Sequence, residues 1–172
     1  TAGVREVEVP AAGSVADVWN PEIYAYHTPW IRKSPELYQP ATRALIQRAA
    51  ETSSITYAQA RRHVDLVRRE ISKVFQDVDL LITPTQRTPA GLISPAGRGA
   101  APVAAGGAGA LNNTAAFNIY GLPTMSIPCG FTLDGLPIGL QISGAPFAES
   151  TVITLAYAYE QATEWHQRRP KL

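Results

Sequence analysis

The sequence predicts an α/β fold, and three observations lead to this class. Amphipathic helical patterns cover residues 56–76 and 149–166, apolar runs of strand length occur at 77–85, 124–127 and 138–143, and the two kinds of segment alternate along the chain. A chain of 172 residues with 45% hydrophobic residues is long enough to bury a core. We therefore expect a single domain over residues 1–172.

The first part of the sequence predicts a short strand and an interrupted helix. Three valines between residues 4 and 9 alternate with charged residues, which favours a strand that ends at Pro10. Apolar and aromatic residues spaced by three or four favour a helix over 14–34. Pro21 and Pro29 lie within this pattern, so we expect short or kinked helical pieces.

The clearest helical pattern covers residues 56–76. Thr56 with Gln59 matches a capping box, and apolar residues repeat at alternating steps of four and three along one side. The opposite side is charged and carries Arg61, Arg62, Asp65, Arg68 and Arg69. Because Asp65 can pair with an arginine one turn away on either side, we interpret this arginine face as solvated surface rather than as a binding surface.

The second half of the sequence predicts three strands, a long connection and two helices. The run DVDLLITPT at 77–85 is typical of a buried strand in the centre of a sheet. Residues 86–110 are rich in glycine, alanine and proline, and such long connections are usually functional or mobile. The remaining elements are a short helix or turn at 112–120, strands at 124–127 and 138–143 joined through a turn at Asp134–Gly135, and a final helix at 149–166.

Composition excludes several classes of function. The formal net charge is +1 and like charges do not cluster, so nucleic acid and membranes are not expected partners. No apolar stretch reaches the roughly 18 residues that span a bilayer, and the first residues do not resemble an export signal, so we expect a cytoplasmic protein. A single cysteine cannot form an internal disulfide.

No complete set of catalytic residues is evident from the residues themselves. The patterns GxSxG, HExxH and CxxC are absent and the three histidines are widely separated, so we expect neither a metal site nor a cofactor. The GGAGA segment at 106–110 lacks the lysine of a phosphate-binding loop. Cys129 lies between apolar segments, and we interpret it as a buried structural thiol rather than as a nucleophile.

The succession of segments is more specific than any single motif. DVDLLITPT is followed by a glycine- and alanine-rich loop, then by NTAAFNIYGLPTMSIPCGF, DGLPIGLQISGAPF and ESTVITLAYAYEQATEWHQRRP. This order resembles the C-terminal part of the amidase signature family. The helices around EIYAYHTPW and SSITYAQARRHVDLVRREISKVF are similar to those that precede this region in bacterial amidases. The resemblance covers essentially the whole chain and implies the C-terminal part of the amidase signature fold, a mixed β-sheet flanked by helices.

The resemblance also implies a reaction whose catalytic residues lie outside this sequence. Members of the family hydrolyse carboxamides to an acid and ammonia or an amine through a serine acyl-enzyme. They use two serines and a lysine around a glycine- and serine-rich signature in the N-terminal part. The adjacent serines Ser53 and Ser54 have no flanking glycines, and the three lysines match no corresponding motif. No catalytic residue is therefore implied here, and we expect this chain to be inactive alone.

Residues of the substrate-pocket wall are implied at three positions. In related enzymes of the family, the residues equivalent to Thr114, Phe117 and Phe147 line the acyl side of the substrate cavity. An alternative remains open, in which Phe117 and Phe147 simply fill the core. Glutamine-using members hold the substrate amine with an acidic residue just upstream of the FN element, where this chain has Leu-Asn-Asn, which argues against glutamine as the amide donor.

Three functions remain open. The chain can be the C-terminal part of an amidase, a non-catalytic scaffold or binding module, or a fragment of the amidase-like subunit of a glutamine-dependent tRNA amidotransferase. In the complete enzyme the expected ligand is a small-molecule amide. The sheet face and edge that the N-terminal amidase portion normally covers would be exposed, so that portion or a second copy of this chain is the expected partner.

Overall fold

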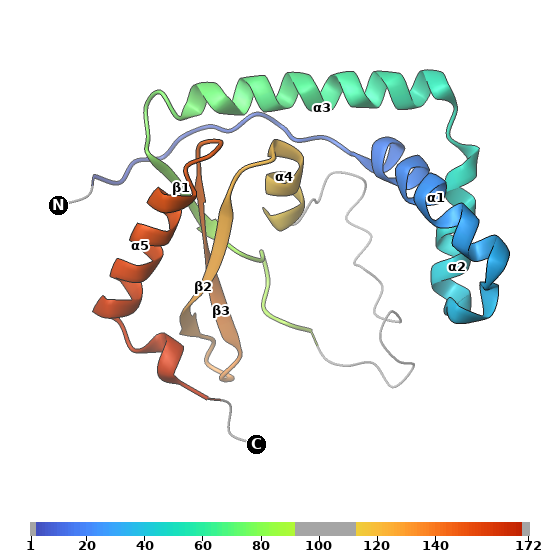
Figure 1. Cartoon of the computed structure of the whole chain (residues 1–172). Coiled ribbons are helices and arrows are strands. Elements are labelled where there is room, and N and C mark those ends of the chain that lie inside the picture. Colours follow the sequence, from blue (N-terminus) through green and yellow to red (C-terminus); the bar gives the residue numbers. More distant parts are fainter. Residues whose placement is uncertain (1–2, 92–112, 170–172) are drawn as a thin grey trace. The chain divides into compact units, whose positions relative to one another are not determined.

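The computed structural model describes residues 3–91 and 113–169 (Figure 1). The chain falls into two compact units. One is Gly13–Val67, and the other combines Thr1–Ala12 with Arg68–Leu172. The single domain expected over residues 1–172 stays a prediction. Most of the predicted connection at 86–110 lies outside the described residues, as does the GGAGA segment.

The unit Gly13–Val67 is helical. It contains α1 (Ala16–Lys33), α2 (Pro40–Arg48) and the first part of α3 (Ser54–Val74). Short 3₁₀ turns at Pro35–Leu37 and Ala49–Glu51 follow α1 and α2.

The short helical pieces predicted for 14–34 are wrong, because α1 runs without a break through both prolines, while the predicted kink stays a prediction. Val18 near its first turn and Ile31 near its last turn are buried. Packing at both ends therefore holds the helix together and offsets the backbone hydrogen bonds that Pro21 and Pro29 cannot make.

The predicted N-terminal strand is also not formed. Residues 3–15 contain neither helix nor strand, and Val4 is 90% exposed. None of the described strands pairs with this segment. Without a neighbouring strand to accept its backbone hydrogen bonds, alternation of valines is not enough to make a strand.

Helix α3 is confirmed, but it begins earlier than predicted. The hydroxyl oxygen of Ser53 accepts a hydrogen bond from the backbone N–H of Thr56 at 3.1 Å, so Ser53 is the N-cap and Thr56 lies in the first turn. The two lie three residues apart, which is the spacing of an N-cap to the N3 position. The first of the two adjacent serines thus has a structural role.

The charges of the arginine face do not pair as predicted. Among the described residues, no ion pair joins Asp65 to Arg61 or Arg69. Arg61 instead lies 3.8 Å from the carboxylate of Glu22, and both side chains are partly exposed. Such a pair contributes little to stability, so this part of the face is solvated surface, as predicted.

The other unit is built on a three-stranded sheet. Strands β1 (Leu80–Pro84), β2 (Thr124–Phe131) and β3 (Pro137–Gly144) lie in the order β1-β3-β2 and pair antiparallel throughout. The helices and strands confirm the predicted α/β class. The three described strands form no parallel pair, so this part of the expected mixed sheet is antiparallel. The short turn between β2 and β3 explains that pair, because a short turn can join only antiparallel neighbours.

The turn predicted at Asp134–Gly135 is confirmed, whereas the central position predicted for β1 is wrong. Gly135 has a φ of +81°, and its N–H donates to the carbonyl of Thr132 at 2.9 Å. The strand β1 lies at one edge of the described sheet, and Ile82 within it is 50% exposed. Strand β3 occupies the centre because it pairs on both sides.

The two faces of the sheet differ in chemistry. Helix α5 (Glu149–Ala162) lies beside the sheet (Figure 1). It packs on the apolar face, where Ile127 and Ile142 meet Val152 and Ala156. The 3₁₀ turn Trp165–Gln167 follows α5.

The opposite face is polar, with hydrogen bonds between neighbouring strands. They join Thr83 of β1 to Gln141 of β3 at 3.3 Å and Thr124 of β2 to Ser143 of β3 at 2.9 Å. A further hydrogen bond of 2.6 Å joins Ser126 of β2 to Thr85, which follows β1. Gln141 and Ser143 are buried. The cross-strand bonds satisfy their polar groups, as burial requires.

Candidate functional site

The candidate site centres on helix α4 (Asn113–Tyr120), which follows the long connection and leads directly into β2. Two of the three predicted pocket residues, Thr114 and Phe117, lie one turn apart on this helix. The third, Phe147, lies between β3 and α5. Thr124 at the start of β2 pairs with Ser143 near the end of β3, so α4 and the Phe147 segment adjoin the same end of the sheet.

The side chains of the three residues have different environments. Phe117 is 6% exposed, and its ring meets the ring of Tyr120 edge to face with centroids 5.5 Å apart. Thr114 is half-buried. Phe147 is 93% exposed and has a φ of +66°. Their role at a substrate pocket stays a prediction. For Phe117, burial and the contact with Tyr120 agree with the alternative that its ring fills the core.

The conformation of Phe147 is unusual. It is the one non-glycine residue with a positive φ among residues 3–91 and 113–169. The left-handed region costs a residue with a bulky side chain about 1–2 kcal/mol. The exposed ring of Phe147 gains no packing in this chain. The strained backbone and the exposed ring of Phe147 therefore do not stabilise the unit. Strain of this kind concentrates at functional sites.

Helix α4 is held by hydrogen bonds at both ends. At its start, the side-chain amide of Asn113 donates to the carbonyl of Pro84 at 2.5 Å. At its end, the hydroxyl of Tyr120 donates to the carbonyl of Pro10 at 2.5 Å, and Arg68 Nε donates to the carbonyl of Ile119 at 2.9 Å. These anchors join residues distant in sequence, and no sequence signal indicated them.

We expect Tyr120 to make the unit sensitive to alkaline pH. Burial raises the pKa of Tyr120 above its ordinary value of 10.0. Because folding raises this pKa, the protonated Tyr120 hydroxyl contributes fully to stability below about pH 10. Its contribution is lost as the pH rises through the pKa of the folded state. We expect Tyr120→Phe to lower the free energy of unfolding by about 1 kcal/mol at pH 7, because one hydrogen bond is missing. When the pH is raised above 10, the variant should lose less stability than the wild type does.

Urea unfolding at pH 7 and above pH 10 measures this difference. Tyr157→Phe is the matched control, since Tyr157 is exposed on α5. A Tyr120→Phe variant with the same alkaline loss as the wild type would contradict the assignment.

Cys129 lies in β2, and its thiol donates to the carbonyl of Ile138 at 3.5 Å. Burial raises the pKa of this thiol, which lowers the thiolate fraction at neutral pH. We expect iodoacetamide at pH 8 to alkylate Cys129 more slowly than it alkylates glutathione, and Cys129→Ala to leave amide hydrolysis unchanged. Fast alkylation together with lost turnover would restore Cys129 as a nucleophile candidate.

Two hollows on the described surface include none of the predicted pocket residues. One, of about 310 Å³, is lined by residues 160–164 together with His166 and Gln167. The other, of about 280 Å³, is lined by residues 5–8 with Val74 and Asp77. Within the described ranges, no three His, Cys, Asp or Glu side chains group as metal ligands, and no helix is long and apolar enough to cross a membrane.

Sequence comparisons find relatives of this chain among amidases and amidotransferase subunits. A family model described as Amidase matches residues 27–153. The chain is 38% identical to an amidase of Pseudomonas putida over 177 residues, which cover 97% of this chain and 37% of that protein. It is 44% identical over 116 residues to a glutamyl-tRNA(Gln) amidotransferase subunit of Synechococcus sp. (strain JA-2-3B'a(2-13)), covering 67% of this chain and 22% of that protein.

Solved structures share the fold. A crystal structure of an amidase aligns with a TM-score of 0.70 and 25% identity, covering 94% of this chain and 38% of the amidase chain. A bacterial aryl acylamidase of the amidase signature family aligns with a TM-score of 0.71 and 23% identity over 96% of this chain and 39% of that enzyme. This chain thus spans well under half the length of its relatives.

Proposed function

Since this chain belongs to the amidase signature family, we propose that it is the C-terminal part of an amidase that hydrolyses carboxamides to an acid and ammonia or an amine. The observation that carries the proposal is the 38% identity to the Pseudomonas putida amidase, which extends over 97% of this chain. The nucleophilic serine, the second serine and the lysine belong to the part of the enzyme that this chain does not span. Serine attack on the amide carbonyl forms an acyl-enzyme, and water then releases the acid.

In this proposal the chain contributes strands to the sheet and a wall to the substrate pocket. Thr114, Phe117 and Phe147 contact the acyl group of the substrate and perform no bond chemistry. Burial of an aromatic side chain against an apolar acyl group contributes about 2 kcal/mol to binding. The exposure of Phe147 supports this assignment, because its ring is available to a ligand.

The preceding part of the enzyme is the partner that this proposal requires. Strand β1 lies at an edge of the described sheet, and Ile82 within it is half exposed. An N-terminal amidase portion that covers this region, or else a second copy of this chain, would remove that apolar surface from water. The substrate is a small carboxamide, and we place the enzyme in the cytoplasm.

The amidase-like subunit of a tRNA-dependent amidotransferase is the second candidate. It is favoured by the 44% identity to the Synechococcus protein, but that similarity covers 67% of this chain. Asn113 stands just upstream of Phe117 and Asn118, and its side-chain amide bonds to the carbonyl of Pro84. It is neutral and already engaged, so it does not supply the carboxylate that would hold the amine of glutamine. A non-catalytic scaffold or binding module is the third candidate.

A substrate panel separates these candidates. The natural-length protein is incubated with acetamide, hexanamide, benzamide, an anilide and glutamine, and release of ammonia or amine is measured. The proposal predicts hydrolysis of at least one simple carboxamide without tRNA. Turnover of glutamine alone would favour the amidotransferase, and no turnover of any amide would favour the scaffold.

A further inference from the structure

Helix α4 is short, and its position depends on its anchors. It has eight residues, and isolated helices of this length are not stable in water. The last carbonyls of a helix have no partner within the helix and need donors from elsewhere. At α4 one of these carbonyls, that of Ile119, receives the Nε–H of Arg68 at 2.9 Å.

The contact between Arg68 and α4 is close and directional. Gly121 follows the helix with a φ of +69°, and a side chain there would begin 3.3 Å from Arg68 Nε. The guanidinium therefore lies against the backbone at the end of α4. Because the donor is charged and the acceptor sits at the negative end of the helix dipole, this bond is stronger than a neutral one.

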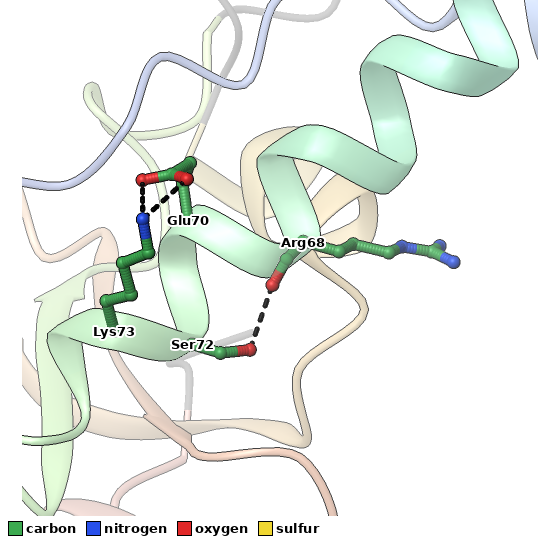
Figure 2. A network of polar contacts seen from close by, with 4 residues as sticks. All are labelled: Arg68, Glu70, Ser72 and Lys73. Carbon is green, nitrogen blue, oxygen red and sulfur yellow. Dashed lines mark hydrogen bonds and ion pairs between the residues drawn. The ribbon is translucent and has the colours of Figure 1, made fainter.

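The side chain of Arg68 is separate from the other polar contacts on its part of α3. Figure 2 shows its side chain extending away from Lys73, whose ammonium contacts the carboxylate of Glu70 at 2.7 and 2.8 Å. The hydroxyl of Ser72 donates to the backbone carbonyl of Arg68 at 2.9 Å and leaves its side chain untouched. Among the described residues, no carboxylate forms an ion pair with Arg68.

We propose that Arg68 is a positioning residue that sets the acyl selectivity of the enzyme by fixing α4 and, through it, Thr114 and Phe117. This inference rests on the proposed function. Arg68 itself does not touch the substrate. It acts through the Ile119 carbonyl, which lies less than one turn from Phe117.

The first test measures α4 directly and needs no activity. In the natural-length protein, amide hydrogen exchange is compared between the wild type, Arg68→Ala and Arg68→Lys, with Arg69→Ala as the control. Arg69 is the neighbouring exposed arginine on the same helix. We expect Arg68→Ala to speed amide exchange in residues 113–121 about tenfold, because one charge-assisted hydrogen bond is lost. The exchange rates in α5 should stay unchanged. Arg68→Lys keeps the charge but lacks Nε, so its exchange rates should lie between those of the wild type and Arg68→Ala.

The second test measures selectivity. We expect Arg68→Ala to lower the ratio of kcat/KM for hexanamide to that for acetamide about tenfold, with kcat for acetamide little changed. Arg69→Ala should match the wild type in both tests. The proposal would be overturned if Arg68→Ala left amide exchange in residues 113–121 unchanged, or if it sped exchange in α5 by the same factor. It would also be overturned if exchange in α4 rose while the ratio of kcat/KM values stayed the same. If the protein hydrolyses no amide, the proposed function fails, while the exchange test still decides whether Arg68 holds α4.

Discussion

Replacing Ile142 with alanine is expected to lower the free energy of unfolding by about 2–5 kcal/mol, the range for truncating a fully buried aliphatic side chain. Ile142 is 0% exposed in the central strand β3, where it packs with Ile127 and with Val152 and Ala156 of α5. Because β3 pairs with both other strands, a cavity at this position weakens the contact between the sheet and α5. Urea unfolding followed by circular dichroism measures the change.

Ile82→Ala is the matched control for this prediction. Ile82 is the same residue type and stands directly opposite Ile142 in the register of β1 and β3, but it is half exposed. Its truncation removes less apolar area from contact and should cost about 1 kcal/mol or less. Equal losses for the two variants would contradict the burial described for β3.

Replacing Phe147 with glycine is expected to change stability and activity in opposite directions. Glycine adopts the φ of +66° without strain, so relief of about 1–2 kcal/mol exceeds the added entropy of the unfolded chain and stability should rise by about 1 kcal/mol. If Phe147 contacts the acyl group, losing about 2 kcal/mol of apolar contact lowers kcat/KM about 30-fold for hexanamide. Thermal unfolding and steady-state hydrolysis by the natural-length protein measure the two effects.

Leu133→Gly serves as the control for the Phe147 prediction. Leu133 is also fully exposed, in the turn between β2 and β3, but its φ is not positive. Glycine there relieves no strain and adds unfolded entropy, so stability should fall slightly and activity should not change. A Phe147→Gly variant that is less stable and fully active would refute the strain argument and the pocket assignment together.

Local patterns predicted the elements whose partners are close in sequence. The four and three spacing of apolar residues predicted α3, and the Asp134–Gly135 signal predicted the turn that makes β2 and β3 antiparallel neighbours. The valines of residues 4–9 gave a false strand, because alternation does not show whether a partner strand is present. The apolar run in β1 suggested a central strand for the same reason, since a run of hydrophobic residues does not reveal how many neighbours it has.

The candidate site was less predictable from the residues alone. Thr114, Phe117 and Phe147 came from the family resemblance, and the structure adds their different burial. The anchors of α4 join Arg68 to Ile119 and Tyr120 to Pro10 across 51 and 110 residues, and no periodicity encodes contacts of that range. The arginine face is an example of a contact that spacing does not predict. Spacing suggested ion pairs with Asp65, whereas Arg68 donates a hydrogen bond to the carbonyl of Ile119 on another helix.

Labelling with a serine-directed fluorophosphonate tests whether this chain is part of a serine amidase whose nucleophile lies outside residues 1–172. The 172-residue chain and the natural-length protein are each treated with the probe, digested and mapped, with hydrolysis of the best amide measured in parallel. The expected result is no labelled serine and no turnover for the isolated chain, and in the natural-length protein one labelled serine outside residues 1–172. A specifically labelled serine within residues 1–172, accompanied by turnover of the isolated chain, would contradict it.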